Sequence, residues 1–76
     1  MIEVNILSPH EILFSGQAES VTLPGEEGVF EVRPLHRSLV SRLLPGVIVI
    51  DQQWLAIQRG VVRVAQGSVT AIVEPE

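Results

Sequence analysis

The sequence has 76 residues, no cysteine and a formal net charge of −4, and 46% of its residues are hydrophobic. This length allows one domain, and the absence of cysteine excludes disulfides and thiolate metal sites. An acidic chain whose five cations are all well-separated arginines lacks a basic stripe for nucleic acid, and two histidines are too few for a dedicated metal cage. We therefore expect no metal, no cofactor and no nucleic-acid partner.

The apolar residues are spread along the chain. No run approaches the roughly 18 residues that a membrane-spanning helix requires, and the N-terminus lacks the basic lead and apolar block of a signal peptide. Such high apolar content in so small a domain predicts that a partner covers part of its surface.

Alternation of apolar and polar residues dominates the chain from its start. Ile2, Val4 and Ile6 alternate with Glu3 and Asn5, which is typical of a half-buried strand. In chain order, further strands are predicted over 11–16, 18–25, 28–32, 46–51 and 54–59, followed by a hairpin over 60–74 that turns at Gln66 and Gly67. Short strands at such regular intervals predict an all-β sandwich or barrel.

One segment, 36–44, has helical spacing. Leu39, Leu43 and Leu44 would share one side of a helix, but the segment is short and Pro45-Gly46 ends it. We predict an irregular or single-turn element there.

Two groups of residues suggest catalysis and are better explained otherwise. Glu26 and Glu27 are adjacent carboxylates, but on a glycine-bounded turn they are expected to be solvated, and they would repel a phosphate. Ser38 and Ser41 follow His36, yet no Gly-x-Ser-x-Gly elbow is present, so a loop histidine with capping hydroxyls is the preferred interpretation.

The aromatic residues and the remaining polar residues give weaker signals. Phe14 and Phe30 are predicted to be core residues, and Trp54 to pack in the core or at the sandwich edge. His10 follows Pro9 in a turn and is predicted to be exposed. Arg37 and Arg42 have two open interpretations, contacts with acidic groups of a partner or a solvated rim.

The order of several short motifs carries a resemblance that covers essentially the whole chain. The chain opens with Ser-Pro-x-x-x-Leu-Phe-x-Gly, and a Pro-Gly-x-x-Gly-x-Phe turn follows. Then come a Pro-x-His loop, a segment of the family pattern Leu-x-Pro-Gly and a later glycine. The residues concerned are Ser8, Pro9, Leu13, Phe14, Gly16, Pro24, Gly25, Gly28, Phe30, Pro34, His36, Leu39, Leu44, Pro45, Gly46 and Gly60. In this order they resemble the epsilon subunit of F-type ATP synthases.

The resemblance implies a roughly ten-stranded β-sandwich, or flattened barrel, that forms a single domain over residues 1–76. It also implies a non-catalytic rotor subunit at the foot of the central stalk, which docks on the gamma subunit and the c-ring and couples proton or sodium transport to ATP synthesis. The expected location is the cytoplasmic side of the inner membrane, peripheral and within the complex. The family's C-terminal helical hairpin, with its inhibitory action, is not expected from a sequence that stops at Glu76.

Site residues also follow from the resemblance. The implied c-ring-facing residues are Glu26, Glu27, Gly28, Val29, His36, Arg37 and Ser38, and the implied gamma-facing residues are Ser8, Pro9, Val40, Ser41, Arg42 and Leu43. Because the family's chain bends here, the Glu26–Val29 turn and the His36–Ser38 loop are predicted to form one end of the sandwich.

The sequence departs from the family pattern at Arg37-Ser38, where Ala-Pro is usual, and at Arg33, where an apolar residue is common. Two alternative functions remain: a free-standing β-sandwich module that binds a small ligand or a protein, and a hydrolase that uses His36 and a serine.

Overall fold

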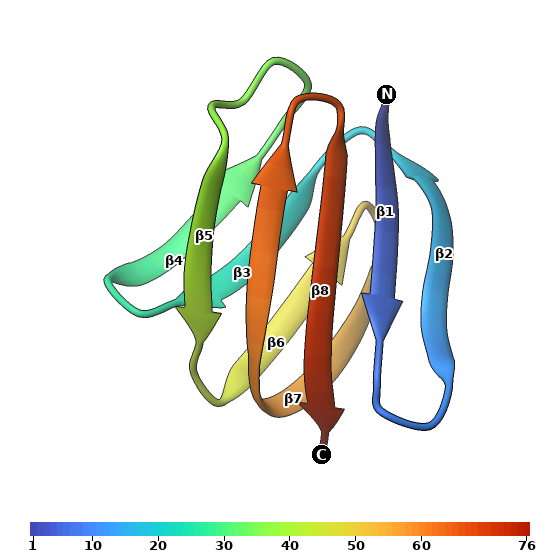
Figure 1. Ribbon diagram of the computed structural model, residues 1–76, viewed down its shortest axis with the longest axis vertical. Helices are drawn as coiled ribbons and strands as arrows, with labels where there is room; N and C mark the ends of the chain where they lie inside the picture. Colours follow the sequence, from blue (N-terminus) through green and yellow to red (C-terminus); the bar gives the residue numbers. More distant parts are fainter.

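The computed structural model describes residues 1–76 and is built of strands, with no helix (Figure 1). In chain order the strands are β1 (Ile2–Leu7), β2 (Ile12–Ala18), β3 (Val21–Gly25), β4 (Gly28–Val32), β5 (Leu39–Leu43), β6 (Gly46–Ile50), β7 (Gln53–Ala65) and β8 (Ser68–Pro75). The predicted all-β class is confirmed. No helix of a length and hydropathy suited to crossing a bilayer is present.

The strands form two layers that face each other. Hydrogen bonding joins them in the order β2-β1-β8-β7-β5-β3-β4, and β6 pairs with both β3 and β7. The front layer in Figure 1 contains β2, β1, β8 and β5, while β4, β3 and β6 lie behind it. All pairings are antiparallel except that of β1 with β8.

The long strand β7 belongs to both layers. Its residues 53–57 pair with β6 in the back layer, and residues 59–65 pair with β8 in the front layer. Between them the register with β8 shifts at Ile57/Arg59, as at a β-bulge, and such a bulge bends a strand. The predicted strands 54–59 and 60–65 are therefore one bent strand, and the sandwich has eight strands where roughly ten were expected.

Gly60 occupies the position where β7 enters the front layer. A Cβ on Gly60 would lie 2.7 Å from both the carbonyl oxygen of Ile72 and Cγ1 of Val73. Since real Cβ atoms do not approach so closely, only glycine lets β7 and β8 lie this near each other.

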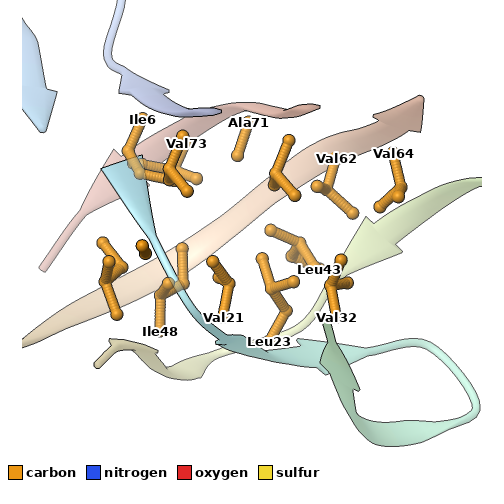
Figure 2. Close-up of a cluster of buried hydrophobic side chains, with 14 of the residues drawn as sticks. Ile6, Val21, Leu23, Val32, Leu43, Ile48, Val62, Val64, Ala71 and Val73 are labelled. Carbon is orange, nitrogen blue, oxygen red and sulfur yellow. The ribbon is translucent and has the colours of Figure 1, made fainter. Parts of the chain in front are cut away.

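The core between the layers is entirely hydrophobic. Sixteen aliphatic residues are buried, and no polar or charged side chain is. In Figure 2, Val21, Leu23 and Ile48 of the back layer face Val62 and Ala71 of the front layer. Phe14 and Phe30, predicted to be core residues, are only partly buried and pack against this cluster from its margin.

Two further expectations were wrong because successive side chains of a strand point to opposite faces of the sheet. The segment predicted to be irregular or a single turn contains the strand β5, because Leu39 and Leu43 share a face in a strand as well as in a helix. Trp54 is 70% exposed, because Leu55 and Ile57 take the inward positions of β7 and leave Trp54 on the outer face.

The turn between β6 and β7 is tied to the turn between β2 and β3. Asp51, with φ of 52°, accepts hydrogen bonds at its Oδ1 from the backbone N–H groups of Glu19 (3.0 Å) and Ser20 (3.2 Å). Its own N–H donates to the Ser20 carbonyl at 3.2 Å. These bonds fix the two turns to one another at one end of the sandwich.

Gly60→Ala is expected to lower the free energy of unfolding by about 1–3 kcal/mol, the usual cost of inserting atoms into a packed site. Gly16→Ala is the control, because its Cβ would meet only Phe14 ring carbons at 3.6 and 3.7 Å. That change should be neutral or stabilise by up to about 1 kcal/mol, through the unfolded chain. Urea unfolding of both variants measures the difference, and equal stability of the two would contradict the role given to Gly60.

Candidate protein-docking surfaces

The turn between β3 and β4 presents two free carboxylates. Gly25 pairs with Gly28, whose φ of 125° suits glycine, and Glu26 and Glu27 lie exposed between them. Neither carboxylate forms an ion pair. The Phe30 ring packs directly on Gly25, where an added Cβ would lie 2.6 Å from a ring carbon, so the turn is held against the sandwich by one aromatic side chain.

The loop between β4 and β5 has its own internal bonding. The N–H of His36 donates to the Arg33 carbonyl at 3.1 Å, and the His36 Nδ1 donates to the Arg37 carbonyl at 2.7 Å. The adjacent Leu35 has φ of 73° and is 87% exposed. The hydrogen bond to a carbonyl requires the proton on Nδ1, so the imidazole is oriented by backbone and not by a serine.

The turn and the loop lie apart. In Figure 1 the Glu26–Glu27 turn is at the left margin and the loop over 33–38 is at the top, at opposite ends of β4. The prediction that they form one end of the sandwich is wrong, because β4 separates them and pairs with β3 over its whole length. Whether each segment contacts a c-ring remains a separate proposal.

The residues predicted to face gamma come from two elements. Ser8 closes the β1–β2 turn: its Oγ accepts from the N–H groups of His10 (3.3 Å) and Glu11 (3.1 Å). Pro9 and His10 are exposed at the tip of this turn, as predicted for His10. The second element is strand β5.

Strand β5 divides its residues between the surface and the core. Val40 and Arg42 point outward and are exposed, whereas Ser41 is half-buried and Leu43 is 2% exposed. Leu43 is therefore a core residue that no partner reaches. The Ser41 hydroxyl donates to the Arg42 carbonyl at 2.9 Å, so it too is directed at backbone rather than at His36.

The structure brings together residues that the sequence assigned to different partners. An open groove of about 660 Å³ lies between the β3–β4 turn and β5, and both Glu26–Val29 and Val40–Arg42 line it. A neighbouring depression of about 420 Å³ joins Pro9, Glu26 and Arg42 to residues of β7 and β8. The turn, β5 and the β1–β2 turn thus border one continuous surface.

Val61 in β7 and Ile72 in β8 belong to this surface and were missed. They are 49% and 57% exposed and lie directly opposite each other. The sequence does contain a signal for them in the adjacent apolar pairs Val61-Val62 and Ile72-Val73. Neighbouring residues of a strand cannot both face the core, so one apolar residue of each pair must lie on the outer face. Beside them, a hydrogen bond from Arg59 to Glu74 and the negative charge of that carboxylate raise the pKa of Arg59.

The family model of the "ATP synthase, Delta/Epsilon chain, beta-sandwich domain" matches residues 1–75. The chain belongs to this family. It is 42% identical to the ATP synthase epsilon chain of a Nitratiruptor species and 40% identical to that of Sulfurimonas denitrificans. Each match covers 96% of this chain and 60% of the relative, so the chain spans about three-fifths of these relatives' length.

Solved structures agree with the family fold. A chain in the central stalk and c-ring structure of the Tetrahymena thermophila mitochondrial ATP synthase superposes with a TM-score of 0.75 at 16% identity, covering 96% of this chain and 63% of that one. A chain in the OSCP/F1/c-ring structure of the Euglena gracilis enzyme gives a TM-score of 0.86 at 20% identity, covering 95% and 49%. At these identities the likeness concerns the fold.

Phe30→Ala is expected to destabilise the domain by about 1–3 kcal/mol, below the range for a fully buried aromatic, because Phe30 is only partly buried. Leu23→Ala, at a position with 0% exposure, is the comparison and should cost about 2–5 kcal/mol. Chemical denaturation of both variants provides the measurement. A larger loss for Phe30→Ala than for Leu23→Ala would mean that the ring anchors more than the β3–β4 turn.

Proposed function

We propose that this chain is the β-sandwich of an ATP synthase epsilon subunit and acts as a non-catalytic part of the rotor. It docks on the gamma subunit and on the c-ring at the foot of the central stalk, and so helps couple proton or sodium transport to ATP synthesis. The complex holds it at the cytoplasmic side of the inner membrane. The observation that carries this proposal is the family match over residues 1–75.

The surface of the domain supports a docking role. Val29, Val40, Leu35 and Trp54 are each at least 70% exposed. A small domain that leaves so many large apolar side chains in water gains free energy when a partner covers them. Two large hollows of the surface, of about 660 and 630 Å³, are open grooves, which suit protein contact better than enclosure of a small ligand.

The exposed carboxylates of the β3–β4 turn support its proposed contact with the c-ring. Glu26 and Glu27 lie at the tip of a hairpin and have no internal partner, so they are free to meet polar loops. Charges of this kind set orientation and rate of docking more than affinity. A second proposed contact with the c-ring consists of His36, Arg37 and Ser38. Because this loop lies apart from the β3–β4 turn, it would contact the ring at a different place.

The first test is co-purification. Gamma subunit from the same organism, mixed with this chain, should migrate with it on gel filtration. Binding should also raise the thermal midpoint of the domain, since a partner at 100 times its dissociation constant stabilises the native state by about 2.7 kcal/mol. A midpoint that saturating gamma subunit leaves unchanged would count against the proposed function.

The second test reverses charge at the turn. In the assembled enzyme, Glu26→Lys with Glu27→Lys is expected to leave ATP hydrolysis intact and reduce ATP-driven ion pumping, because the catalytic sites are elsewhere and only the docking changes. Glu3→Lys with Glu19→Lys makes the same change in charge at exposed positions away from the turn. Arg37→Glu is tested alone, because the loop lies apart from the turn. Normal pumping by the Glu26/Glu27 double variant would exclude the turn as the ring-facing surface.

A further inference from the structure

Strand β5 has one edge that lacks a neighbouring strand over most of its length. Its other edge pairs with β7 from Leu39 to Leu43, whereas β3 meets β5 only through the pair of Gly25 and Leu43. In Figure 1 this free edge is the left edge of β5. An open strand edge offers unpaired backbone N–H and C=O groups to another chain.

The backbone groups on this edge follow from the alternation of a strand, whose successive residues direct their N–H and C=O groups to opposite sides. The N–H of Leu44 donates to the Pro24 carbonyl of β3 at 2.8 Å. Val40 and Arg42, two and four residues earlier, therefore direct their groups to the same side, and no backbone bond outside the strand ladders reaches them. The Arg42 carbonyl accepts from the Ser41 hydroxyl at 2.9 Å. This leaves the N–H and C=O of Val40 and the N–H of Arg42 without a partner.

The free edge lies in the open groove of about 660 Å³ between β5 and the β3–β4 turn. Residues 39–42 of β5 line one side of this groove, and residues 25–30 line the other. Since a strand rises about 3.3 Å per residue, these residues of β5 offer about 13 Å of edge. Phe30 and Leu39 are half-buried and pack against the core cluster, so they supply apolar surface inside the groove. The groove thus combines a free backbone edge with a place for apolar side chains.

The β3–β4 turn determines which kind of partner fits this edge. In Figure 1 the turn projects to the left beyond β5. A second copy of the chain, laid edge to edge with β5, would bring its own two layers against this projection. A single extended segment requires only the width of one strand, about 4.8 Å. The geometry therefore favours an extended segment over a second folded sandwich.

The charges of the groove indicate the chemistry and the direction of the segment. Glu26 and Glu27 lie at the end where β5 meets β3, neither is in an ion pair, and they outnumber the one guanidinium there, that of Arg42. Arg37 precedes the other end of β5. A segment that runs antiparallel to β5 and begins with a basic residue places that residue beside the two carboxylates and away from Arg37.

We propose that the free edge of β5 binds an extended segment of a partner protein by strand addition. The segment runs antiparallel to β5, forms backbone hydrogen bonds with Val40, directs alternate apolar side chains toward Phe30, and carries a lysine or arginine beside Glu26 and Glu27. In this mode of recognition the main chain supplies affinity and the alternate side chains supply specificity. The proposal stands on the strand edge and the groove and does not depend on the proposed function.

The probe is the peptide acetyl-Lys-Val-Thr-Val-Thr-Val-amide, titrated into the isotope-labelled whole chain and followed by NMR. It should shift the amide resonances of Val40 and Arg42 and slow their hydrogen exchange, which is fast in the free chain because both N–H groups are open. The amide of Ser41 faces β7 and is the internal control, already protected without peptide. The reversed peptide, acetyl-Val-Thr-Val-Thr-Val-Lys-amide, has the same composition and should bind about two- to fivefold more weakly, because its lysine loses the carboxylates.

N-methylation of the peptide distinguishes strand addition from apolar packing. When the valines point into the groove, the threonine N–H groups face β5, so methylating the threonines should weaken binding by about tenfold or more. Methylating the valines alters N–H groups that face away from β5 and should leave binding close to that of the unmodified peptide.

Two variants of the chain test the same contact from the other side. Val40→Pro removes the N–H on the free edge, spares the ladder to β7 and should weaken binding by about tenfold. Glu27→Lys should weaken it by about two- to fivefold, whereas Glu19→Lys makes the same change of charge at an exposed position outside the groove and should bind like wild type. Thermal unfolding verifies that each variant is folded, and Glu27→Lys serves where Val40→Pro is not.

Three results would overturn the proposal. If millimolar peptide leaves the amides of Val40 and Arg42 unchanged, the edge does not take a strand. If the two methylated peptides bind equally, the groove holds the peptide by apolar contact and not by strand addition. If the shifts are confined to β2 or to the outer edge of β4, the strands that end the sheet, the segment adds to a different edge.

Discussion

The structure depends on the packing of two thin layers of strands around an aliphatic core. Each strand has one inward face, and the buried positions are filled by isoleucine, valine, leucine and alanine with no polar group among them. Layers packed in this way lie about 10 Å apart. Since β7 serves both layers, it must bend between them, and the tight approach at Gly60 is the condition under which its second half reaches β8.

This division of faces determines what the outer surface looks like. A chain that is 46% hydrophobic has more apolar residues than sixteen buried positions can hold. The remainder lie at outward positions of strands, where they gather into rows because cross-strand neighbours are fixed by register. Val61 and Ile72 are neighbours for this reason, although they lie on different strands of a hairpin. Strand pairing thus gathers exposed apolar side chains into a contiguous surface, and such a surface suits contact with a partner.

The sequence predicted the strands and the turns well, because alternation and glycine placement are local signals. The hairpin that turns at Gln66 and Gly67 is present, with Gly67 at φ of 80°. Local signals failed where one sequence pattern fits two structures. The spacing of Leu39 and Leu43 fits either a helix or a strand. Trp54 is apolar enough for the core, but Leu55 and Ile57 take the inward positions of β7 and leave it on the outer face. The relative positions of segments far apart in space could not be predicted from local patterns. The turn at Glu26–Glu27 and the loop at His36 were expected together, but they lie at opposite ends of β4. Their separation depends on the direction in which β4 runs, which the amino-acid composition of the two segments does not reveal.

A docking surface on paired strands keeps its shape under load better than a docking surface on loops. Forty of the 46 backbone hydrogen bonds lie within the strands. The side chains of Arg42, Val61 and Ile72 come from three strands and keep their spacing through the ladder that joins β5, β7 and β8. The Glu26–Glu27 turn has a different mechanical support, since the Phe30 ring seated on Gly25 braces it against the sandwich. The apolar residues of paired strands and the braced charged turn therefore differ in chemistry: a partner would meet the first mainly through buried area and the second mainly through surface charge.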